Sequence, residues 1–164
     1  MPLSHQTAPA NPLDRIEHMA EARHWPIERA GPDEVHMALE SGWGNLHLSL
    51  EWREDLEGLH LSSGFDFKVP ATRRAETARL IAIVNEALYF GHFDLWHNDG
   101  TIIFRNGLIL AGGAEVNERQ CERLIGLAIE TCERYYPAFQ FAAWGGKTAE
   151  EAIEASLLDT VGSA

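Results

Sequence analysis

The segment from Gly91 to Arg105, GHFDLWHNDGTIIFR, constrains the fold more than any other stretch, because it predicts a β-hairpin whose pairs can be counted. Asp99-Gly100 is a dipeptide typical of two-residue hairpin turns, whose backbone twist matches that of the flanking strands. Counting back from this turn pairs Asn98 with Thr101, His97 with Ile102, Trp96 with Ile103, Leu95 with Phe104 and Asp94 with Arg105. The hairpin therefore predicts an antiparallel sheet.

The two faces of this hairpin differ, because successive side chains of a strand point to opposite sides. A core face carries Phe93, Leu95, Ile102 and Phe104. The other face carries Trp96 and Ile103 above an ion pair of Asp94 with Arg105. A sheet that buries one face needs no second apolar pair, so we take these four residues as a candidate protein-contact surface. In a second interpretation, the long helix after Asn117 covers Trp96 and Ile103 within one subunit.

Three earlier strands alternate between apolar and polar residues, which predicts a sheet with one buried and one wetter face. They are joined by a turn at residues 41–44 and an acidic loop at residues 54–58, and a short extended piece, Ile27 to Arg29, precedes them. The inward residues are Val35, Met37 and Leu39 in the first strand, Leu46, Leu48, Leu50 and Trp52 in the second, and Leu59, Leu61, Phe65 and Phe67 in the third.

Helix signals flank these strands. Asn11-Pro12 provides a cap and a first-turn proline for a helix that should end at Trp25. A second helix should follow Pro70 and end at Gly91. Its apolar residues spread over roughly 180° of the circumference, wider than the ~100° stripe that one sheet requires. This helix should therefore contact two neighbours, one of which could be another subunit.

The longest helix should open at Asn117 with Gln120 completing a capping box. Pro137 should kink or interrupt it, and Asn106-Gly107 in the preceding strand is a candidate bulge. A second capping box, Thr148 with Glu151, should open a short terminal helix. The stripe of the long helix carries Cys121, Leu124, Ile125, Ala128, Cys132, Tyr135 and Phe139, so both cysteines should pack in the core, too far apart to bridge.

The predicted fold class is α+β, with a five-stranded antiparallel sheet packed by helices in the order α-β-β-β-α-β-β-α plus a short C-terminal helix. We expect one domain over residues 11–160, a flexible tail at residues 1–10 and a C-terminal tail at residues 161–164. No repeat or linker divides the chain.

The charge balance argues against two classes of partner. The 25 acidic and 13 basic residues give a formal net charge of −12, which repels nucleic-acid phosphates and anionic membranes. No run of 18 apolar residues exists, and the N-terminus, MPLSHQTAPANP, has neither the basic start nor the apolar stretch of a signal peptide. A cytoplasmic location is the expectation.

Motifs for chemistry are weak. The run Gly145-Gly146-Lys147-Thr148 ends like a phosphate-binding loop, but Phe141 stands where that motif needs its first glycine, and a helix precedes it where a strand is required. The alternative is a glycine linker with Thr148 as a helix cap. Counting registers places His47 opposite Ala38, His60 opposite Glu51 and His36 near Ser49, without bringing these histidines together. We therefore expect neither a metal nor a cofactor, and no catalytic residues.

With the elements placed, the chain resembles the alphaproteobacterial branch of the YbjN family from about Asn11 to Gly162. The resemblance implies a fold like that of type III secretion chaperones, the role of a bacterial sensory transduction regulator, and no recognised catalytic residues. The positions that carry it are Gly91-His92-Phe93-Asp94-Leu95, Asp99-Gly100, Phe104-Arg105, Trp52, Asn85, Tyr136-Pro137 and Trp144-Gly145-Gly146.

The leading functional hypothesis is a non-catalytic homodimer that acts through contacts with a further, unidentified protein, as a regulator or a chaperone-like adaptor. A second hypothesis is a nucleotide-binding or small-ligand protein, or an enzyme, that uses the loop at Lys147. A third is a domain that senses a small ligand in a groove beside the sheet.

Overall fold

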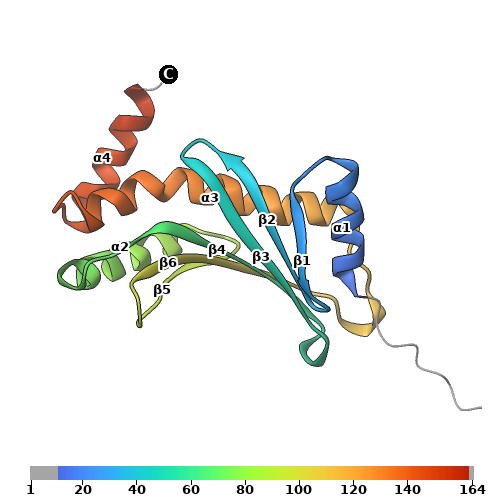
Figure 1. Ribbon diagram of the computed structural model, residues 1–164. Coiled ribbons are helices and arrows are strands. Elements are labelled where there is room, and N and C mark those ends of the chain that lie inside the picture. The colour runs from blue at the N-terminus through green and yellow to red at the C-terminus, as the bar shows by residue number, and fades with distance from the viewer. Residues whose placement is uncertain (1–10, 163–164) are drawn as a thin grey trace, which may run out of the picture.

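The computed structural model describes residues 11–162, with side chains to residue 158, as a six-stranded antiparallel sheet and four α-helices (Figure 1). The predicted α+β class and the order of its elements are confirmed. The predicted tail at residues 1–10 lies outside the described residues, as do the last two residues of the predicted tail 161–164. The helices are α1 (Pro12–Ala22), α2 (Arg74–Glu86), α3 (Glu118–Ala143) and α4 (Ala149–Gly162).

The sheet has the strand order β1-β2-β3-β4-β6-β5. It has one strand more than predicted, because four of the five residues in the short extended piece that begins at Ile27 pair with the next strand. The strands are β1 (Ile27–Gly31), β2 (Glu34–Ser41), β3 (Gly44–Arg53), β4 (Gly58–Lys68), β5 (His92–Leu95) and β6 (Thr101–Ile109).

Helix α1 begins as predicted and ends early. The Asn11 side chain accepts a hydrogen bond from the Leu13 N–H, 3.0 Å away, and Pro12 occupies the first turn. The helix ends at Ala22, three residues before the predicted end. His24 adopts the left-handed conformation, with φ of 57°, and the Trp25 N–H turns back to the Ala20 carbonyl. This type of helix end satisfies a terminal carbonyl without continuing the helix.

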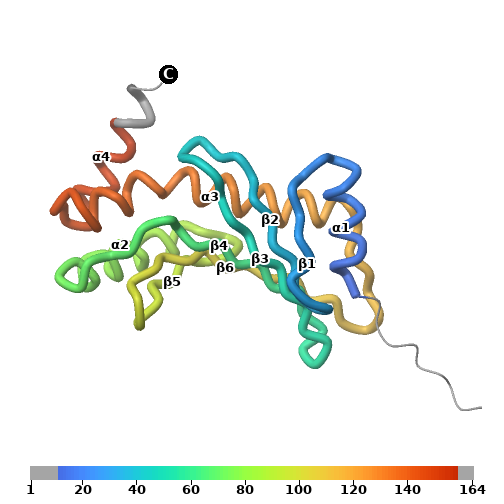
Figure 2. The backbone as a smooth tube through the Cα atoms, in the orientation of Figure 1, coloured from blue at the N-terminus to red at the C-terminus, as the bar shows by residue number. Residues whose placement is uncertain are grey.

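Helix α3 runs along one face of the sheet, with α1 near one of its ends and α2 and α4 near the other (Figures 1 and 2). Its 26 residues span ~39 Å at 1.5 Å per residue. Both predicted capping boxes form. The helix continues through Pro137, so the expected interruption does not occur. Every member of the predicted stripe except the half-buried Tyr135 is buried.

The centre of the core is aromatic. Phe93 from β5 lies with its ring centroid 5.3 Å from Phe104 of β6, 5.0 Å from Phe139 of α3 and 5.9 Å from Phe65 of β4. These tilted and edge-on contacts join β4, β6 and β5, at one end of the sheet, to the central helix. Cys132 is buried nearby in α3, and burial raises the pKa of its thiol to about 12.

Helix α2 is shorter than predicted, because it ends at Glu86 and leaves residues 87–91 as a connecting segment. Its wide apolar arc is explained within the chain, since α2 contacts β5, α3 and α4. The arc therefore needs no second subunit. Phe90, which lies within the predicted bounds of this helix, falls outside the observed helix and has 67% of its surface exposed.

The β5–β6 hairpin pairs two residues out of the predicted register. Phe93 lies opposite Phe104, Asp94 opposite Ile103 and Leu95 opposite Ile102. The predicted two-residue turn needs a positive φ at both central residues, and of the two only Gly100 has one. A four-residue loop, residues 97–100, forms instead, and the Asp99 carboxylate accepts the Thr101 N–H. A two-residue shift preserves the faces, so the predicted core face is confirmed.

The predicted bulge is also misplaced. Residues 106 and 107 of β6 pair regularly with β4, and the irregularity lies in β4. Gly64 pairs with Ile103 and Lys68 pairs with Thr101, so three β4 residues lie opposite one residue of β6. Pairing between β3 and β4 also stops at Gly64. The sheet therefore loosens at this point, as strands do at bulges.

Candidate functional site

One face of the sheet packs on the helices, and within residues 11–162 no helix lies on the other, which we call the open face (Figures 1 and 2). The strand registers place its side chains in rows that cross the sheet. One row contains Ala38, His47, Gly64, Ile103 and Asp94, and the next contains Glu28, His36, Ser49, Ser62, Arg105 and His92. Gly64, Ser49 and Ser62, which have little or no side chain, thus occupy the middle of the face beside His47 and Ile103.

This arrangement produces a groove of about 770 Å³ on the open face. The missing side chain of Gly64 hollows its floor beside Ile103, whose Cγ1 would lie 3.9 Å from a Cβ at that glycine. Trp96 and Thr101 line the groove at one end, and residues of β1 and β2 line it at the other. A concave surface with an aromatic wall and a few polar groups is suited to binding.

Trp96 and Ile103 share the open face but differ in exposure. Trp96 is 55% exposed, and Ile103 is only 6% exposed although it lies outside the core cluster. Ile103 alternates with Ile102 and Phe104, whose side chains face the helices. Helix α3 therefore lies on the opposite side of the sheet from both candidate contact residues. The shifted register places Asp94, and not Trp96, opposite Ile103.

The ion pair of Asp94 with Arg105 forms, with Nη1 3.3 Å from Oδ2, but diagonally across the strands. It extends into a network. His92 Nε2 lies 3.2 Å from the same carboxylate oxygen, and Arg105 Nε donates to His60 Nε2 across 3.2 Å. All four candidate contact residues therefore lie together on the open face, and the structure adds His60 and His92 to them.

The pKa of His60 is lowered. Burial disfavours the charged imidazolium, and the Arg105 guanidinium adds repulsion, which the Glu51 carboxylate opposite His60 offsets in part. The neutral ring can then accept the hydrogen bond from Arg105. The predicted registers of His36, His47 and His60 are confirmed. Among the described residues no group of three histidine, cysteine or acidic side chains could hold a metal ion.

The outer edge of β5 is protected by Asn85 of α2, a role that the sequence analysis missed. Asn85 Oδ1 accepts the Phe93 N–H at 2.8 Å, and its Nδ2 donates to the Phe93 carbonyl at 3.0 Å. One amide thus satisfies both backbone groups that this residue would offer to a further strand, which blocks pairing there. Two sequence signals pointed to Asn85: it lies among the apolar residues near the end of the helix, and it is one of the positions that carry the family resemblance.

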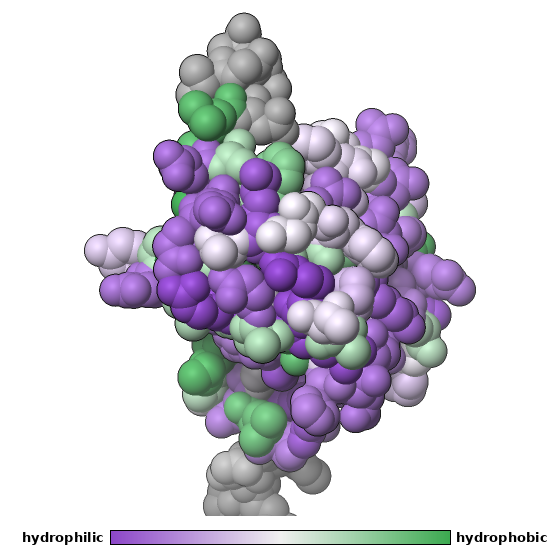
Figure 3. Space-filling model, turned by 90° about the vertical axis from the view of Figure 1, so that its left-hand side faces the viewer, coloured by the Kyte–Doolittle hydropathy of each residue, from purple (hydrophilic) through white to green (hydrophobic). Residues whose placement is uncertain are grey.

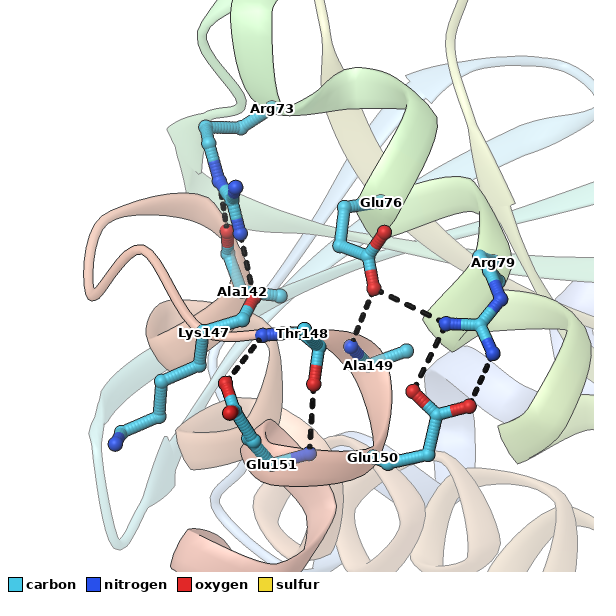
Figure 4. Close-up of polar contacts among 9 residues, drawn as sticks. All are labelled: Arg73, Glu76, Arg79, Ala142, Lys147, Thr148, Ala149, Glu150 and Glu151. Carbon is cyan, nitrogen blue, oxygen red and sulfur yellow. Dashed lines mark hydrogen bonds and ion pairs between the residues drawn. The ribbon is translucent and has the colours of Figure 1, made fainter.

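The loop at residues 145–148 connects α3 to α4 and uses its donors within the chain (Figure 4). The Thr148 N–H donates to Glu151, and the Ala149 N–H donates to Glu76 of α2. In a phosphate-binding loop such N–H groups point at the phosphate. Carboxylates hold these donors here.

The same loop is also fastened by Arg73, which donates to the carbonyls of Ala142 and Lys147 (Figure 4). The Lys147 ammonium lies 5.9 Å from the centre of the Phe141 ring. These contacts correspond to the glycine linker with a helix cap at Thr148 that the sequence offered as the alternative.

Other exposed apolar side chains occur around α2 and α4. Figure 3, which views that end of the molecule, shows small hydrophobic patches separated by hydrophilic surface. Those with more than half of their surface exposed in this part of the chain are Tyr89, Phe90, Trp144, Leu157 and Leu158. None of the helices in residues 11–162 could span a membrane.

Comparison with known proteins gives one family and one fold. Residues 12–141 match the sequence model of the YbjN family, described as "Putative bacterial sensory transduction regulator". The crystal structure of YbjN from E. coli, titled "a putative transcription regulator", superposes with a TM-score of 0.56 at 10% identity, covering 93% of this chain and 96% of that one. At this identity the likeness concerns the fold. A search of curated proteins found no match.

Proposed function

The chain belongs to the YbjN family, and from this premise we propose that it is a non-catalytic cytoplasmic regulator or chaperone-like adaptor that acts through protein contacts on the open face, first with a second copy of itself. The observation that carries the proposal is the exposed Trp96 indole at the end of the open-face groove. Family membership supports the regulatory role.

The energetics of Trp96 support a contact role. Tryptophan and arginine are enriched at the energetic centres of interfaces, and Trp96 and Arg105 lie on the same face. Covering the exposed 55% of this side chain would remove roughly 140 Å² of largely apolar surface from water, which contributes about 3 kcal/mol. A single residue of this kind can decide whether two subunits stay associated at micromolar concentration.

The geometry favours the face over the sheet edge as the place of contact. Asn85 occupies the backbone groups of Phe93 on the outer edge of β5, so strand addition is blocked there. The open face has no such cover, and Gly64, Ser49 and Ser62 line its groove, where a partner can approach the sheet closely. We infer an interface that crosses the strands.

Light scattering on the purified protein at tens of micromolar tests the dimer. We expect the mass of two chains, and we expect Trp96→Glu to give the mass of one chain with an unchanged circular dichroism spectrum. Trp144→Glu is the matched control, because Trp144 is 64% exposed at the end of α3, away from the open face. It should remain a dimer.

A monomeric parent protein at that concentration would remove the dimer from the proposal. A Trp96→Glu variant that is still dimeric would place the contact elsewhere. Affinity capture from the native cells with the parent and the Trp96→Glu variant as paired baits then tests the wider claim, because a partner on the open face should be recovered only with the parent.

A further inference from the structure

The loosened part of the sheet contains a second hollow. Leu46 and Asn45 of β3 pair with β2 but have no partner in β4, and residues 65–67 of β4 pair with neither neighbour. On the helical side of the sheet, Cys132, Glu133 and Tyr136 of α3 line the gap. The result is a cavity of about 120 Å³, which we call the seam pocket; it shares His47 and Gly64 with the open-face groove, but Trp96 lines only the groove.

Two carboxylates line the seam pocket without a cation beside them. Asp66 accepts a hydrogen bond from the Tyr136 hydroxyl at 2.9 Å, and Glu133 Oε1 accepts the Gly42 N–H at 2.6 Å. Neither carboxylate forms an ion pair with any of the residues whose side chains are described, whereas Asp14, Glu17, Asp55, Asp94 and Glu150 each have an arginine partner. A carboxylate accepts several hydrogen bonds, so both retain free acceptor positions.

Three aromatic side chains form part of the remaining wall of the seam pocket, and the rest consists of small, apolar and polar residues that include His47. Trp43 stacks on Tyr136 with ring centroids 5.5 Å apart, and its Nε1–H donates to the Glu133 carbonyl, which fixes the indole at the mouth. Phe65 packs edge-on against the other side of Tyr136. Burial and the neighbouring Asp66 raise the pKa of Tyr136 to about 12, so the hydroxyl stays protonated at neutral pH and donates to the Asp66 carboxylate.

We propose that the seam pocket binds a small organic cation, a primary alkylammonium ion of a few heavy atoms, whose N–H groups are accepted by Asp66 and Glu133 and whose alkyl part lies against Trp43. Ammonium groups are attracted to carboxylates and to the faces of tryptophan and tyrosine. Anions are excluded, because both charged groups of the pocket and the net charge of −12 repel them. The cavity volume limits the ligand to a small one.

The irregular pairing of β4 between Gly64 and Lys68 explains how the seam pocket forms. A regular β4 would continue its pairing with β3 beyond Gly64, and the gap above α3 would close. The three unpaired residues instead place Asp66 between the buried Phe65 and the half-buried Phe67, and direct its carboxylate to Tyr136. Bulges commonly redirect a side chain in this way beside functional sites.

Titration with propylammonium chloride, followed by the indole N–H resonances of the five tryptophans, tests the proposal. The resonance lost in Trp43→Phe identifies Trp43. We expect that resonance to shift saturably with propylammonium, and not with propanol, a neutral molecule of the same size, or with sodium chloride at equal ionic strength. Asp66→Asn should weaken binding about tenfold or more, since one charge-assisted hydrogen bond is lost.

Two further variants keep the test decisive. Glu133→Gln should weaken binding in the same direction while still accepting the Gly42 N–H. Glu86→Gln removes one charge at the exposed end of α2 and should change the affinity less than twofold. Equal shifts with propanol and propylammonium, an unmoved Trp43 resonance, or unchanged affinity in folded Asp66→Asn and Glu133→Gln proteins would each overturn the proposal.

Discussion

Gly91 stands where a side chain has no room. Its φ is +74°, and a Cβ built on it would lie 2.4 Å from Cζ of Phe104 and 2.9 Å from the Arg105 carbonyl oxygen. We expect Gly91→Ala to lower the free energy of unfolding by about 2–4 kcal/mol, since backbone strain and overpacking add. Gly112→Ala is the control, with φ of +69° and open space around its Cβ, and should cost about 1 kcal/mol. Urea unfolding measures both, and equal losses would contradict the packing argument.

Thr77 presents the opposite situation. Its side chain lies buried in α2, and Oγ1 has no hydrogen-bond partner among the described residues. An unsatisfied buried hydroxyl costs about 1–3 kcal/mol, and valine has the same shape without it. Thr77→Val should therefore raise the free energy of unfolding by about 1 kcal/mol in the same urea experiment, whereas Thr77→Ala should lower it by leaving a cavity. A destabilised Thr77→Val would show that the hydroxyl has a partner.

The attachment of α2 to β5 depends on one amide. Asn85→Ala removes both hydrogen bonds to Phe93 and leaves its backbone groups unpaired at the sheet edge. We expect a loss of about 2 kcal/mol and faster amide exchange at Phe93. Asn106→Ala is the matched control, because its side chain accepts only the exposed Gly107 N–H and should cost less than about 1 kcal/mol. Equal costs would mean that Asn85 does not hold the edge.

Elements whose pattern is set by burial could be predicted from the sequence, and elements set by loop geometry could not. Alternation identified the buried faces of the strands, because a strand has the same two-residue period wherever it pairs. The predicted hairpin register was wrong by two residues because Asp99 has a negative φ, which the residue types of the turn do not reveal. The Asn106-Gly107 bulge was wrong because the irregular pairing arises where β4 leaves β3, a relation between distant strands.

At the scale of the whole molecule, the sequence predicted four residues of the candidate site but not the further residues that the folded chain brings beside them. Trp96, Ile103, Asp94 and Arg105 follow from one hairpin and its alternation. His60 joins them only because β4 pairs with β6, which brings it beside Arg105 although the two are 45 residues apart in the sequence. The seam pocket likewise needs β3, β4 and α3 together. The hairpin pattern therefore supplies the first four residues of the site, and long-range pairing adds the residues that extend it.

We expect His60, on the open face, to make the free energy of unfolding of the whole chain depend on pH. Its folded-state pKa is lowered by burial and by Arg105, so between pH 7 and pH 5 the unfolded chain binds a proton that the folded chain resists. The free energy of unfolding should thus fall as the pH drops through the ordinary histidine range. In His60→Gln, which keeps an acceptor for Arg105, the fall should be smaller.

The matched control for this pH series is His18→Gln, because His18 belongs to α1 on the helical side of the sheet, away from the Arg105 network. Urea unfolding of all three proteins at half-unit pH steps provides the comparison. The exposed carboxylates with lowered pKa, such as Asp99 and Glu150, lose their stabilising effect only at more acid pH, so they leave this window undisturbed. Parallel pH curves for the parent and His60→Gln would show that the imidazolium is tolerated beside Arg105, and that the open face carries no proton-linked strain.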